Sequence, residues 1–548
     1  MSNKFLYVTI IIIIIIMAGG LIQLVAYGHQ DLYLTSDPEI TFFKIVYRRH
    51  TNFTLEAIQQ DFIDTPDFGK RVSCVISRYG DIVRKMHLVV ELPSIPKFNN
   101  ITCTNNTNNT NNTNNTNNTN NTNNTNNQYQ KCESLTKFAW VRRIGFAIIK
   151  TVEIEIGGEI IDRHYGDWLN IWYELTVPDN HSQDKIIGDV EELTNFSNGK
   201  KSYKLFIPLQ FWFNRIAGLA LPVVSLQYSH IKVNLDLNEF SNCYILSPTH
   251  YINIENDFVN FEPSEYLVQN VNGIISLAKF IYYDIIEKRL YISKVSRNSF
   301  MIPSSINTNK KYEISGLTSE FRVIPKVNTK ERIYKNKTIK LSNISLKKCF
   351  LLVEYGFLDD SERTRFSRAR HEYLIEQIFF NGTETINGSH QSFKVGFTQS
   401  CKELIWVSQL ETSIKNNDWF NYTDSLISSI NSYNNYGKNI ITSCGLLFNG
   451  VDRLSTRDIE YFSKLQIYQN HSHNAEEGIN VYSFALHPEN HQPSGTANFT
   501  MIDNVKLRLS VIPKINSKNV AKLRIYGITY NILRISHGIS GLLFQIDF

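Results

Sequence analysis

Apolar and polar residues alternate with a period of two through much of the chain. The segment TVEIEI at 151–156 alternates Val and Ile with Glu, and HIKVNLDL at 230–237 alternates Ile, Val and Leu with polar residues. Two further segments, 86–92 and 505–511, repeat the pattern. Successive side chains of a strand point to opposite faces of a sheet, so each segment predicts a strand with one buried face. We therefore predict an all-β protein whose antiparallel strands form sandwiches or barrels.

The two halves of the chain share an order of features. In the first half, an Asp-Arg pair at 162–163 follows a strand and a glycine turn, and an Asp-Arg pair at 452–453 does the same in the second half. A loop that contains proline then leads to a strongly alternating strand, which begins near Ile231 in the first half and near Val505 in the second. This shared order indicates one β-architecture used twice. One helix is predicted, in the eleven residues from Tyr165, YGDWLNIWYEL.

Residues 104–127 consist only of Asn and Thr, mostly as repeated NNT. Such a segment has no apolar side chain to bury, so we predict a disordered surface loop. Its repeated sequons are interpreted as expansion of a short repeat. Among the other sequons, Asn381, Asn387 and Asn421 are candidates for glycosylation, although an Asn-rich sequence also forms sequons by accident.

Residues 1–16 contain a nearly continuous apolar run from Phe5 to Ile16. The run is shorter than the roughly 20 residues that a membrane-spanning helix needs, but it fits the core of a signal peptide. The sequence MAGG at 17–20 would supply small residues for cleavage. The alternative is that Met17 is the true start and that the preceding residues are translated non-coding sequence. Composition leaves both alternatives open.

The composition is that of a soluble globular protein, with 42% hydrophobic and 20% charged residues. Aromatic residues reach 12%, which favours strands. The net charge of +5 is spread along the chain, so no nucleic-acid footprint stands out. The seven cysteines are dispersed and form no C-x-x-C pair, which predicts reduced and mostly buried thiols. Only Cys103 and Cys132, on either side of the Asn-Thr segment, could be bridged in an oxidising compartment.

Motifs that would carry catalysis are missing from the sequence. It has no P-loop, no G-x-G-x-x-G after a strand, no H-E-x-x-H and no G-x-S-x-G. His471 and His473 would share a face of a strand and could form a metal pair, but we interpret them as loop and surface histidines, because no Cys or carboxylate lies at a supporting spacing. The charge-rich run from Phe357 is interpreted as a solvated connector. We predict no catalytic residue, no cofactor and no metal site.

Several segments taken together resemble the major capsid proteins of the nucleocytoplasmic large DNA viruses, most closely those of the mimivirus group. The segments that carry the resemblance are Met17–Phe53, Ile207–Val233, Phe357–Gln377, Tyr482–Asp503 and Tyr530–Phe544. They lie in both halves of the chain and in the order of the family. The segment YSFALHPENHQPSGTANFTMID is the most specific of them. The family begins near the MAGG sequence, which favours Met17 as the start.

The resemblance implies a double jelly roll, in which two eight-stranded sandwiches stand in tandem. The expected limits are 17–360 for the first jelly roll and 361–548 for the second, with 1–16 as a hydrophobic extension. A segment of about 238–345 matches nothing in the second half, so we expect a large insertion there. The Asn-Thr segment and this insertion make the chain resemble a divergent or minor paralogue.

By resemblance, the protein is a structural capsid protein and not an enzyme. Three chains would form a pseudo-hexagonal capsomer, and capsomers would tile an icosahedral shell that is assembled in the host cytoplasm at virus factories. The expected partners are further copies of the chain, neighbouring capsomers, minor capsid proteins and the internal viral membrane, with no specific nucleic acid. Two alternatives stay open at this point: a secreted or membrane-tethered β-sandwich that binds glycans, and a glycan-active enzyme on a jelly roll.

Overall fold

The computed structural model describes residues 26, 28, 30, 35–45, 47–98, 136–178, 182–262, 265–296, 298–305, 311–334, 341, 344–424, 437–517 and 519–544. Its internal contacts divide the chain into two units, Met1–Asn52 and Phe53–Phe548. Between 36 and 50, the described residues of the first unit form bends and turns and no strand. All the sheets belong to the second unit.

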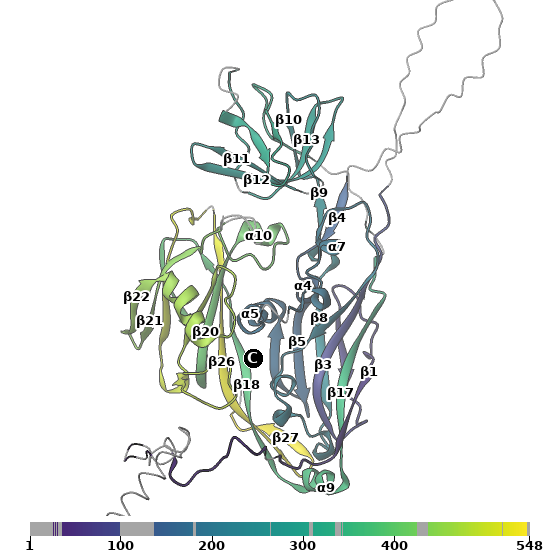
Figure 1. Ribbon diagram of the computed structural model, residues 1–548, viewed down its shortest axis with the longest axis vertical. Helices are drawn as coiled ribbons and strands as arrows, with labels where there is room; N and C mark the ends of the chain where they lie inside the picture. Colours follow the sequence, from purple (N-terminus) through teal and green to yellow (C-terminus); the bar gives the residue numbers. More distant parts are fainter. Residues whose placement is uncertain are drawn as a thin grey trace, which may run out of the picture. The chain divides into compact units, whose positions relative to one another are not determined.

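Eight strands form a first sandwich of two antiparallel sheets (Figure 1). One sheet has the order β1-β17-β3-β7 and the other the order β2-β8-β5-β6. The strands are β1 (Phe53–Gln60), β2 (Arg71–Val75), β3 (Ile82–Leu92), β5 (Ile149–Ile156), β6 (Glu159–Tyr165), β7 (Tyr203–Pro208), β8 (Ile231–Leu237) and β17 (Lys348–Leu358).

A second sandwich follows in the chain, with the sheet orders β18-β26-β20-β23 and β19-β25-β21-β22. Its main strands are β18 (His371–Ile386), β19 (His390–Val395), β20 (Ser400–Leu410), β21 (Ile441–Phe448), β22 (Val451–Asp458), β23 (Ile479–Ser483), β25 (Val505–Val511) and β26 (Ala521–Ser536). Two short strands extend the first of these sheets, β24 (Ala497–Asn498) beside β20 and β27 (Ile539–Leu542) beside β26.

The two sandwiches have the same topology. When the eight main strands of each are counted in chain order, the sheets of both read 1-8-3-6 and 2-7-4-5. This is the Greek-key arrangement of a jelly roll. The two Asp-Arg pairs lie on β6 and β22, which are strand five of each sandwich, and the strands at Ile231 and Val505 are strand seven. The predicted all-β double sandwich and its internal repeat are confirmed.

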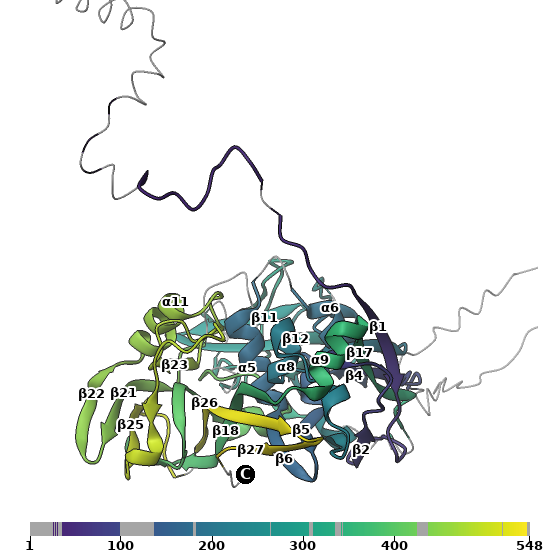
Figure 2. The same ribbon diagram turned by 90° about the horizontal axis from the view of Figure 1, so that it is seen from below.

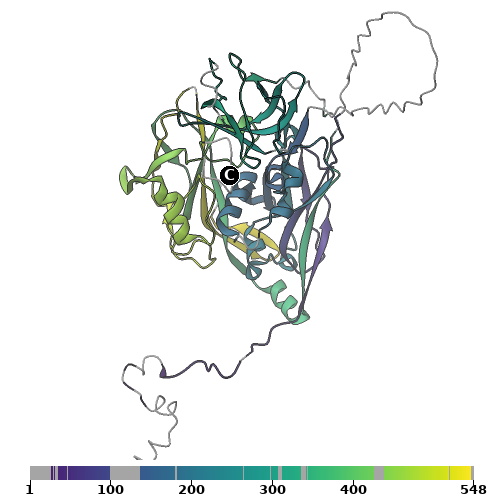
Figure 3. The ribbon, with the colours of Figure 1, turned by 45° about the horizontal axis from the view of Figure 1, so that its top comes forward.

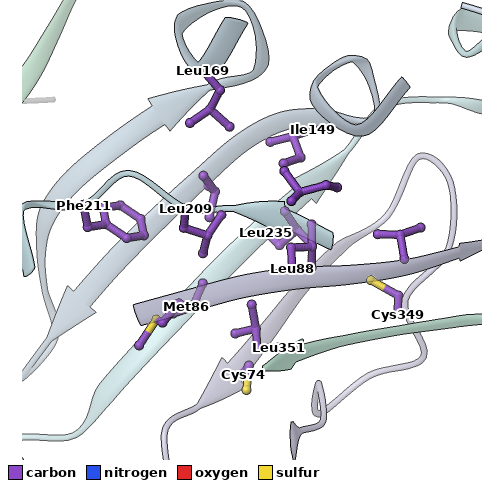
Figure 4. Close-up of a cluster of buried hydrophobic side chains, with 14 of the residues drawn as sticks. Cys74, Met86, Leu88, Ile149, Leu169, Leu209, Phe211, Leu235, Cys349 and Leu351 are labelled. Atoms are coloured by element: carbon purple, nitrogen blue, oxygen red, sulfur yellow. The ribbon is translucent and has the colours of Figure 1, made fainter. Parts of the chain in front are cut away.

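The core of the first sandwich fills the space between its two sheets. Figure 4 shows Met86 and Leu88 of β3 and Leu351 of β17 close to Leu235 of β8, and all four belong to one buried cluster. The second sandwich has a separate core, built from side chains such as Leu404, Trp406, Leu507 and Leu523. The predicted alternation therefore identifies the inward faces correctly.

One predicted outward residue is buried instead. Glu153 of β5 was expected to face solvent, but the structure leaves it almost completely buried. Its carboxylate accepts from Arg71 at 2.8 Å and from Arg163 at 2.7 Å, so the neighbouring strands cover it with cations. An alternating pattern shows which face a side chain lies on, but it does not show whether long side chains from adjacent strands cover that face.

Between β8 and β17 the chain forms a third sheet with the order β15-β14-β11-β12-β13-β10-β16. Its strands are β10 (His250–Asn253), β11 (Tyr266–Val271), β12 (Ile274–Asp284), β13 (Arg289–Lys294), β14 (Ile314–Gly316), β15 (Arg322–Val323) and β16 (Arg332–Ile333). This sheet has its own apolar cluster, and it falls within the segment predicted as an insertion. We call it the insertion sheet. A separate ladder joins β4 (Lys137–Trp140) to β9 (Tyr244–Ser247). The predicted domain limits, 17–360 and 361–548, stay a prediction.

The described helices are short. They are α4 (Ile144–Ala147), α5 (Gly166–Thr176), α6 (Asp184–Ile187), α7 (Glu191–Thr194), α8 (Trp212–Arg215), α9 (Asp360–Arg368), α10 (Glu411–Lys415), α11 (Gln466–Asn470), the 3-10 turns at Ala217–Leu219, Val223–Ser225, Phe240–Asn242 and Phe499–Met501, and a π-turn at Tyr461–Leu465. The helix predicted from Tyr165 is confirmed as α5. The charge-rich connector contains α9, a helix without a buried residue. None of the helices in the described ranges is long and apolar enough to cross a membrane.

The cysteines that the structure describes are free and buried, as predicted: Cys74, Cys243, Cys349, Cys401 and Cys444. Burial raises the pKa of Cys349 to about 12, so its thiol stays protonated and unreactive at neutral pH. The predictions for residues 1–16, for the Asn-Thr segment at 104–127 and for a bridge between Cys103 and Cys132 lie outside the described residues.

Candidate functional site: the junction of the two sandwiches

Helix α5 of the first sandwich packs against the outer face of the second sandwich (Figure 1). We call this contact the junction. Its apolar part includes Trp168, Ile171, Trp172 and Leu175 from α5 with Ile378, Ile405, Val407, Val481, Tyr526 and Ile528 from the sheet β18-β26-β20-β23. Burying one such side chain contributes about 1.5–3 kcal/mol, so this cluster fixes the two sandwiches to each other.

The junction explains why β20 is apolar on both faces. Leu404 and Trp406 point into the core of the second sandwich, while Ile405 and Val407 point toward α5. Nearly every residue of β20 is therefore buried. A strand covered on both sides loses the polar alternation of a surface strand.

The position of α5 depends on a glycine at its first residue. A Cβ atom on Gly166 would lie 2.3 Å from the carbonyl oxygens of both Phe146 and Ile149. No other residue type fits at that separation. The close approach lets the chain turn from the end of β6 directly into the helix.

A largely buried ionic network connects the start of α5 to β26. The Asp167 carboxylate accepts from Arg524 at 2.6 Å and from the Tyr526 hydroxyl at 2.5 Å. Arg524 also donates to Gln409 of β20. Burial alone would lower the pKa of Arg524, but Asp167 raises it above its ordinary value, so the guanidinium remains charged. The three groups satisfy one another inside the junction.

Two consecutive arginines make a second polar link. Arg143 pairs with Glu174 of α5 and donates to Asn170 at 2.6 Å. Arg142 pairs with Asp189 at 3.1 Å and donates to Glu476 of the second sandwich at 3.0 Å. Both arginines lie between β4 and α4, so this loop holds the first sandwich, α5 and the second sandwich together.

A third link lies at the other end of the sheet. Glu376 of β18 accepts from Arg215 of α8 at 2.8 Å and from Lys402 of β20 at 2.5 Å. Burial lowers the pKa of Lys402, and Glu376 opposes that shift by pairing with the ammonium. Beside this triad, the backbone N–H of Ile378 donates to Asp162 of β6 at 3.0 Å. These contacts connect β18 to the first sandwich at Glu376 and Ile378.

The interpretation of His471 as a surface residue is wrong. Its imidazole has an exposed fraction of 0% and lies between Glu403 at 2.7 Å and Glu489 at 3.1 Å. Burial alone would lower the pKa of His471, but the two carboxylates raise it to about 9. His473 instead donates to the Glu174 carbonyl at 2.6 Å, so the two histidines do not form a pair. Across the described ranges, no cluster of three or more His, Cys, Asp or Glu is arranged to hold a metal ion.

The three candidate sequons differ in their surroundings. Asn387 is exposed and Asn381 is partly buried, with its amide donating to the Lys394 carbonyl at 2.9 Å. Asn421 is 1% exposed and donates to Asp418 at 2.8 Å, so the folded chain leaves no room for a glycan there. Glycosylation of Asn381 and Asn387 stays a prediction.

The residues of the junction were not identified from the sequence. Two charged residues in otherwise apolar segments could have indicated the junction. They are Asp167 in the apolar helix and Arg524 in the apolar strand β26. A charge in such a position needs a partner. Nothing local shows which of the many opposite charges that partner is, because the two residues are 357 positions apart.

Two strands on the outer sides of the second unit have free edges. β1 pairs only with β17, and it exposes Phe53 by 54% and Leu55 by 40%. β22 pairs only with β21, and Val451 at its start is 73% exposed. Figures 1 and 2 both show these two strands on opposite sides of the unit. Within the described residues, neither free edge is covered by another strand.

Comparison with known proteins identifies relatives along nearly the whole chain. A family described as the major capsid protein N-terminus matches residues 41–282, and a family described as the large eukaryotic DNA virus major capsid protein matches residues 362–541. The probable capsid protein 4 of Acanthamoeba polyphaga mimivirus is 37% identical over 541 residues, which cover 96% of this chain and 99% of that protein. The major capsid protein of Phaeocystis pouchetii virus is 31% identical and covers 96% of this chain and 100% of its own.

Solved structures show the same fold. PBCV-1 VP54 superposes with a TM-score of 0.58 at 24% identity, covering 92% of this chain and 100% of its own. The faustovirus major capsid protein superposes with a TM-score of 0.61 at 12% identity, covering 93% of this chain and 94% of its own. Both likenesses extend over the two sandwiches, and together with the sequence relatives they confirm the resemblance. The chain belongs to the major capsid protein family of the large eukaryotic DNA viruses.

Proposed function

We propose that this protein is a capsid subunit that trimerises into pseudo-hexagonal capsomers, which tile the icosahedral shell of a large DNA virus. The observation that carries the proposal is the repeat of one sandwich topology within a single chain, with the two copies fixed by a buried junction. Three such chains would present six similar sandwiches around one axis. A threefold body with six similar sides can occupy the sixfold positions of a closed lattice.

The free edges of β1 and β22 support lateral association of this kind. They lie on opposite sides of the second unit, so the β1 side of one copy can face the β22 side of the next. Contacts between two different surfaces form a ring when the rotation closes, and three copies close such a ring. Exposed apolar side chains at an edge strand, such as Phe53 and Leu55, are a liability in a monomer and are covered in an assembly.

The role of such a subunit is structural. It would act through shape, without catalysis, as a component of the virion assembled at cytoplasmic virus factories. Its partners would be further copies of itself, neighbouring capsomers, minor capsid proteins and the internal viral membrane. The groups with reactive side chains, His471 and the junction charges, are each paired with a neighbouring charged group.

The alternative of a secreted glycan-binding sandwich is not supported. The sequence relatives and the solved structures described above are viral capsid proteins, and their likeness covers both sandwiches. The glycan-binding alternative does not explain why one sandwich topology occurs twice in the chain. The capsid fold does explain it, because that fold consists of two such sandwiches.

The oligomeric state of the purified chain from Met17 onward tests the proposal. Size-exclusion chromatography with light scattering should give three times the mass of one chain, and electron microscopy of the same peak should show six-sided particles. A folded monomer at micromolar concentration would contradict the proposal.

A further inference from the structure

We propose that a cavity between the insertion sheet and the two sandwiches binds a small oxyanion, a phosphate or carboxylate group, through Lys279. The cavity has a volume of about 480 Å³, which is within the range of small-molecule sites. We call it the three-way cavity. Its binding role is independent of the capsomer proposed above.

All three parts of the second unit contribute to the wall of the three-way cavity. Among the lining residues are Trp140 and Arg142 from the first sandwich, Tyr266, Lys279 and Lys294 from the insertion sheet, and Lys415, Asp418 and Trp419 from the second sandwich. Figures 1 and 3 show the insertion, in teal, at the ends of both sandwiches. A ligand in this cavity would therefore contact parts of the chain that are far apart in sequence.

Four cations line the cavity, and three of them have an acidic partner. Arg142 pairs with Asp189 at 3.1 Å, Lys294 with Glu331 at 2.9 Å, and Lys415 with Glu411 at 3.3 Å; these are the three paired cations. Lys279 differs, because no carboxylate oxygen of the described residues lies within 4.0 Å of its ammonium. Its near neighbour is the Tyr266 ring, whose centroid is 5.0 Å away.

Lys279 is partly buried in the cavity wall, and this burial lowers its pKa. Asp418 and Glu191 favour the charged form, but both act from beyond contact distance. A partly buried cation without a contacting anion is poorly compensated, and an oxyanion in the cavity would relieve that cost. The chemistry of Lys279 therefore selects a negatively charged ligand.

Trp140 contributes to the wall only through its ring, because its indole nitrogen has almost no accessible surface. Tyr244, Tyr266 and Trp419 give the rest of the wall an aromatic character. This composition suits a ligand that joins an acidic group to an apolar or ring-shaped body.

Isothermal titration calorimetry on the full chain from Met17 tests the proposal. Inorganic phosphate and acetate are titrated separately at constant ionic strength, with chloride as the reference, so that the two arms distinguish a phosphate site from a carboxylate site. We expect saturable binding of at least one anion at one site per chain. The Lys279→Met variant, which keeps the aliphatic stem, should weaken that binding at least tenfold.

The matched control is Lys506→Met, because Lys506 is an exposed lysine of β25 that does not line the cavity. It should bind like the parent chain. Unfolding temperatures of all three proteins, measured in chloride, show whether each variant is folded. Absence of saturable binding by the parent chain would overturn the proposal, and so would equal binding by folded Lys279→Met. The oligomeric state is measured separately, so failure of the capsomer proposal and failure of this one are distinguishable.

Discussion

At Gly166 the chain passes so close to the preceding segment that only a hydrogen atom fits on the inner side. The obstacles are backbone carbonyl oxygens, which cannot rotate away as a side chain can. Elsewhere in a helix, replacing Gly by Ala is favourable by up to about 1 kcal/mol, because Ala loses less backbone entropy on folding. Whether a Gly-to-Ala substitution stabilises or destabilises the fold therefore depends on the space around that glycine.

Gly166→Ala is expected to lower the free energy of unfolding by about 1–3 kcal/mol, the usual cost of overpacking a core. Urea unfolding followed by tryptophan fluorescence measures the change. The control is Gly218→Ala in the turn at Ala217–Leu219, where a Cβ would meet nothing within 4 Å. The free energy of unfolding of that variant should differ from that of the parent chain by less than about 0.5 kcal/mol. Equal effects of the two substitutions would contradict the role of Gly166.

His471 provides a prediction in pH. Its folded pKa of about 9 lies above the ordinary value of roughly 6.5 for an unfolded chain. The protonated imidazole between Glu403 and Glu489 therefore contributes stability that is fully present below about pH 6.5 and is lost as the pH rises through about 9. Between these limits, the unfolding free energy of the parent chain should fall more steeply than that of His471→Gln.

Urea unfolding at pH 6.5, 7.5 and 9 measures the two slopes. His487→Gln is the control, because His487 is exposed in the same part of the chain, and it should keep the slope of the parent. Identical slopes for the parent and His471→Gln would show that His471 is not protonated in the folded chain.

At the scale of elements, the junction combines an apolar face of α5 with buried ion pairs at its margins. Removing one partner of a buried pair leaves the other charge without compensation, which costs about 3–5 kcal/mol. An exposed pair contributes about 0–1 kcal/mol, because water already solvates both groups. The chain contains both kinds, so their contributions can be compared within one protein.

Asp167→Asn is expected to lower the free energy of unfolding by about 3 kcal/mol, because it leaves Arg524 buried without a counter-charge. Lys464→Met removes the exposed pair with Glu460, and it should change the free energy of unfolding by less than about 0.5 kcal/mol. Chemical unfolding of both variants gives the comparison. The double variant Asp167→Asn, Arg524→Met should recover part of the lost free energy of unfolding. If it is as unstable as Asp167→Asn alone, the uncompensated charge of Arg524 is not the cause.

The three-way cavity yields a further prediction in pH. Burial, with a contribution from Glu476, raises the pKa of Asp418 to about 6, while Arg142 and Lys279 oppose the shift. Below pH 6 the carboxyl becomes neutral and no longer repels an anion. Sulfate, which stays doubly charged across this range, should therefore bind several-fold more tightly at pH 5.5 than at pH 7.5. In Asp418→Asn, the affinity for sulfate measured by calorimetry should be equal at the two pH values.

The sequence predicts elements well where one face is buried and the other meets water. The alternation in β3, β5, β8 and β25 and the apolar helix α5 were identified for this reason. β20 was not identified, because it is covered on both sides and shows no alternation. The partners across the junction were also missed, since the contacts are set by how two complete sandwiches meet and not by local pattern.

At the scale of the molecule, the fused pair of sandwiches turns one chain into a building block with two different outer sides. The buried junction holds the two sandwiches together, and the sheet edges at β1 and β22 lie on opposite outer sides of the unit. If these two edges face each other between copies, every chain in a ring has the same surroundings. The number of copies then depends on the angle between the outer sides, which the junction fixes.

The free edge of β1 makes this arrangement testable. Lysine on an edge strand opposes pairing with another chain at little cost to the fold when the position is exposed. The double variant Phe53→Lys, Leu55→Lys should keep the unfolding temperature of one chain but shift the light-scattering mass from trimer toward monomer at micromolar concentration. Phe258→Lys is the matched control, because Phe258 is 66% exposed but belongs to the insertion, away from both free edges. A stable trimer in the double variant would mean that the β1 edge lies outside the contact between copies, and monomers in both variants would point to a general effect of added charge.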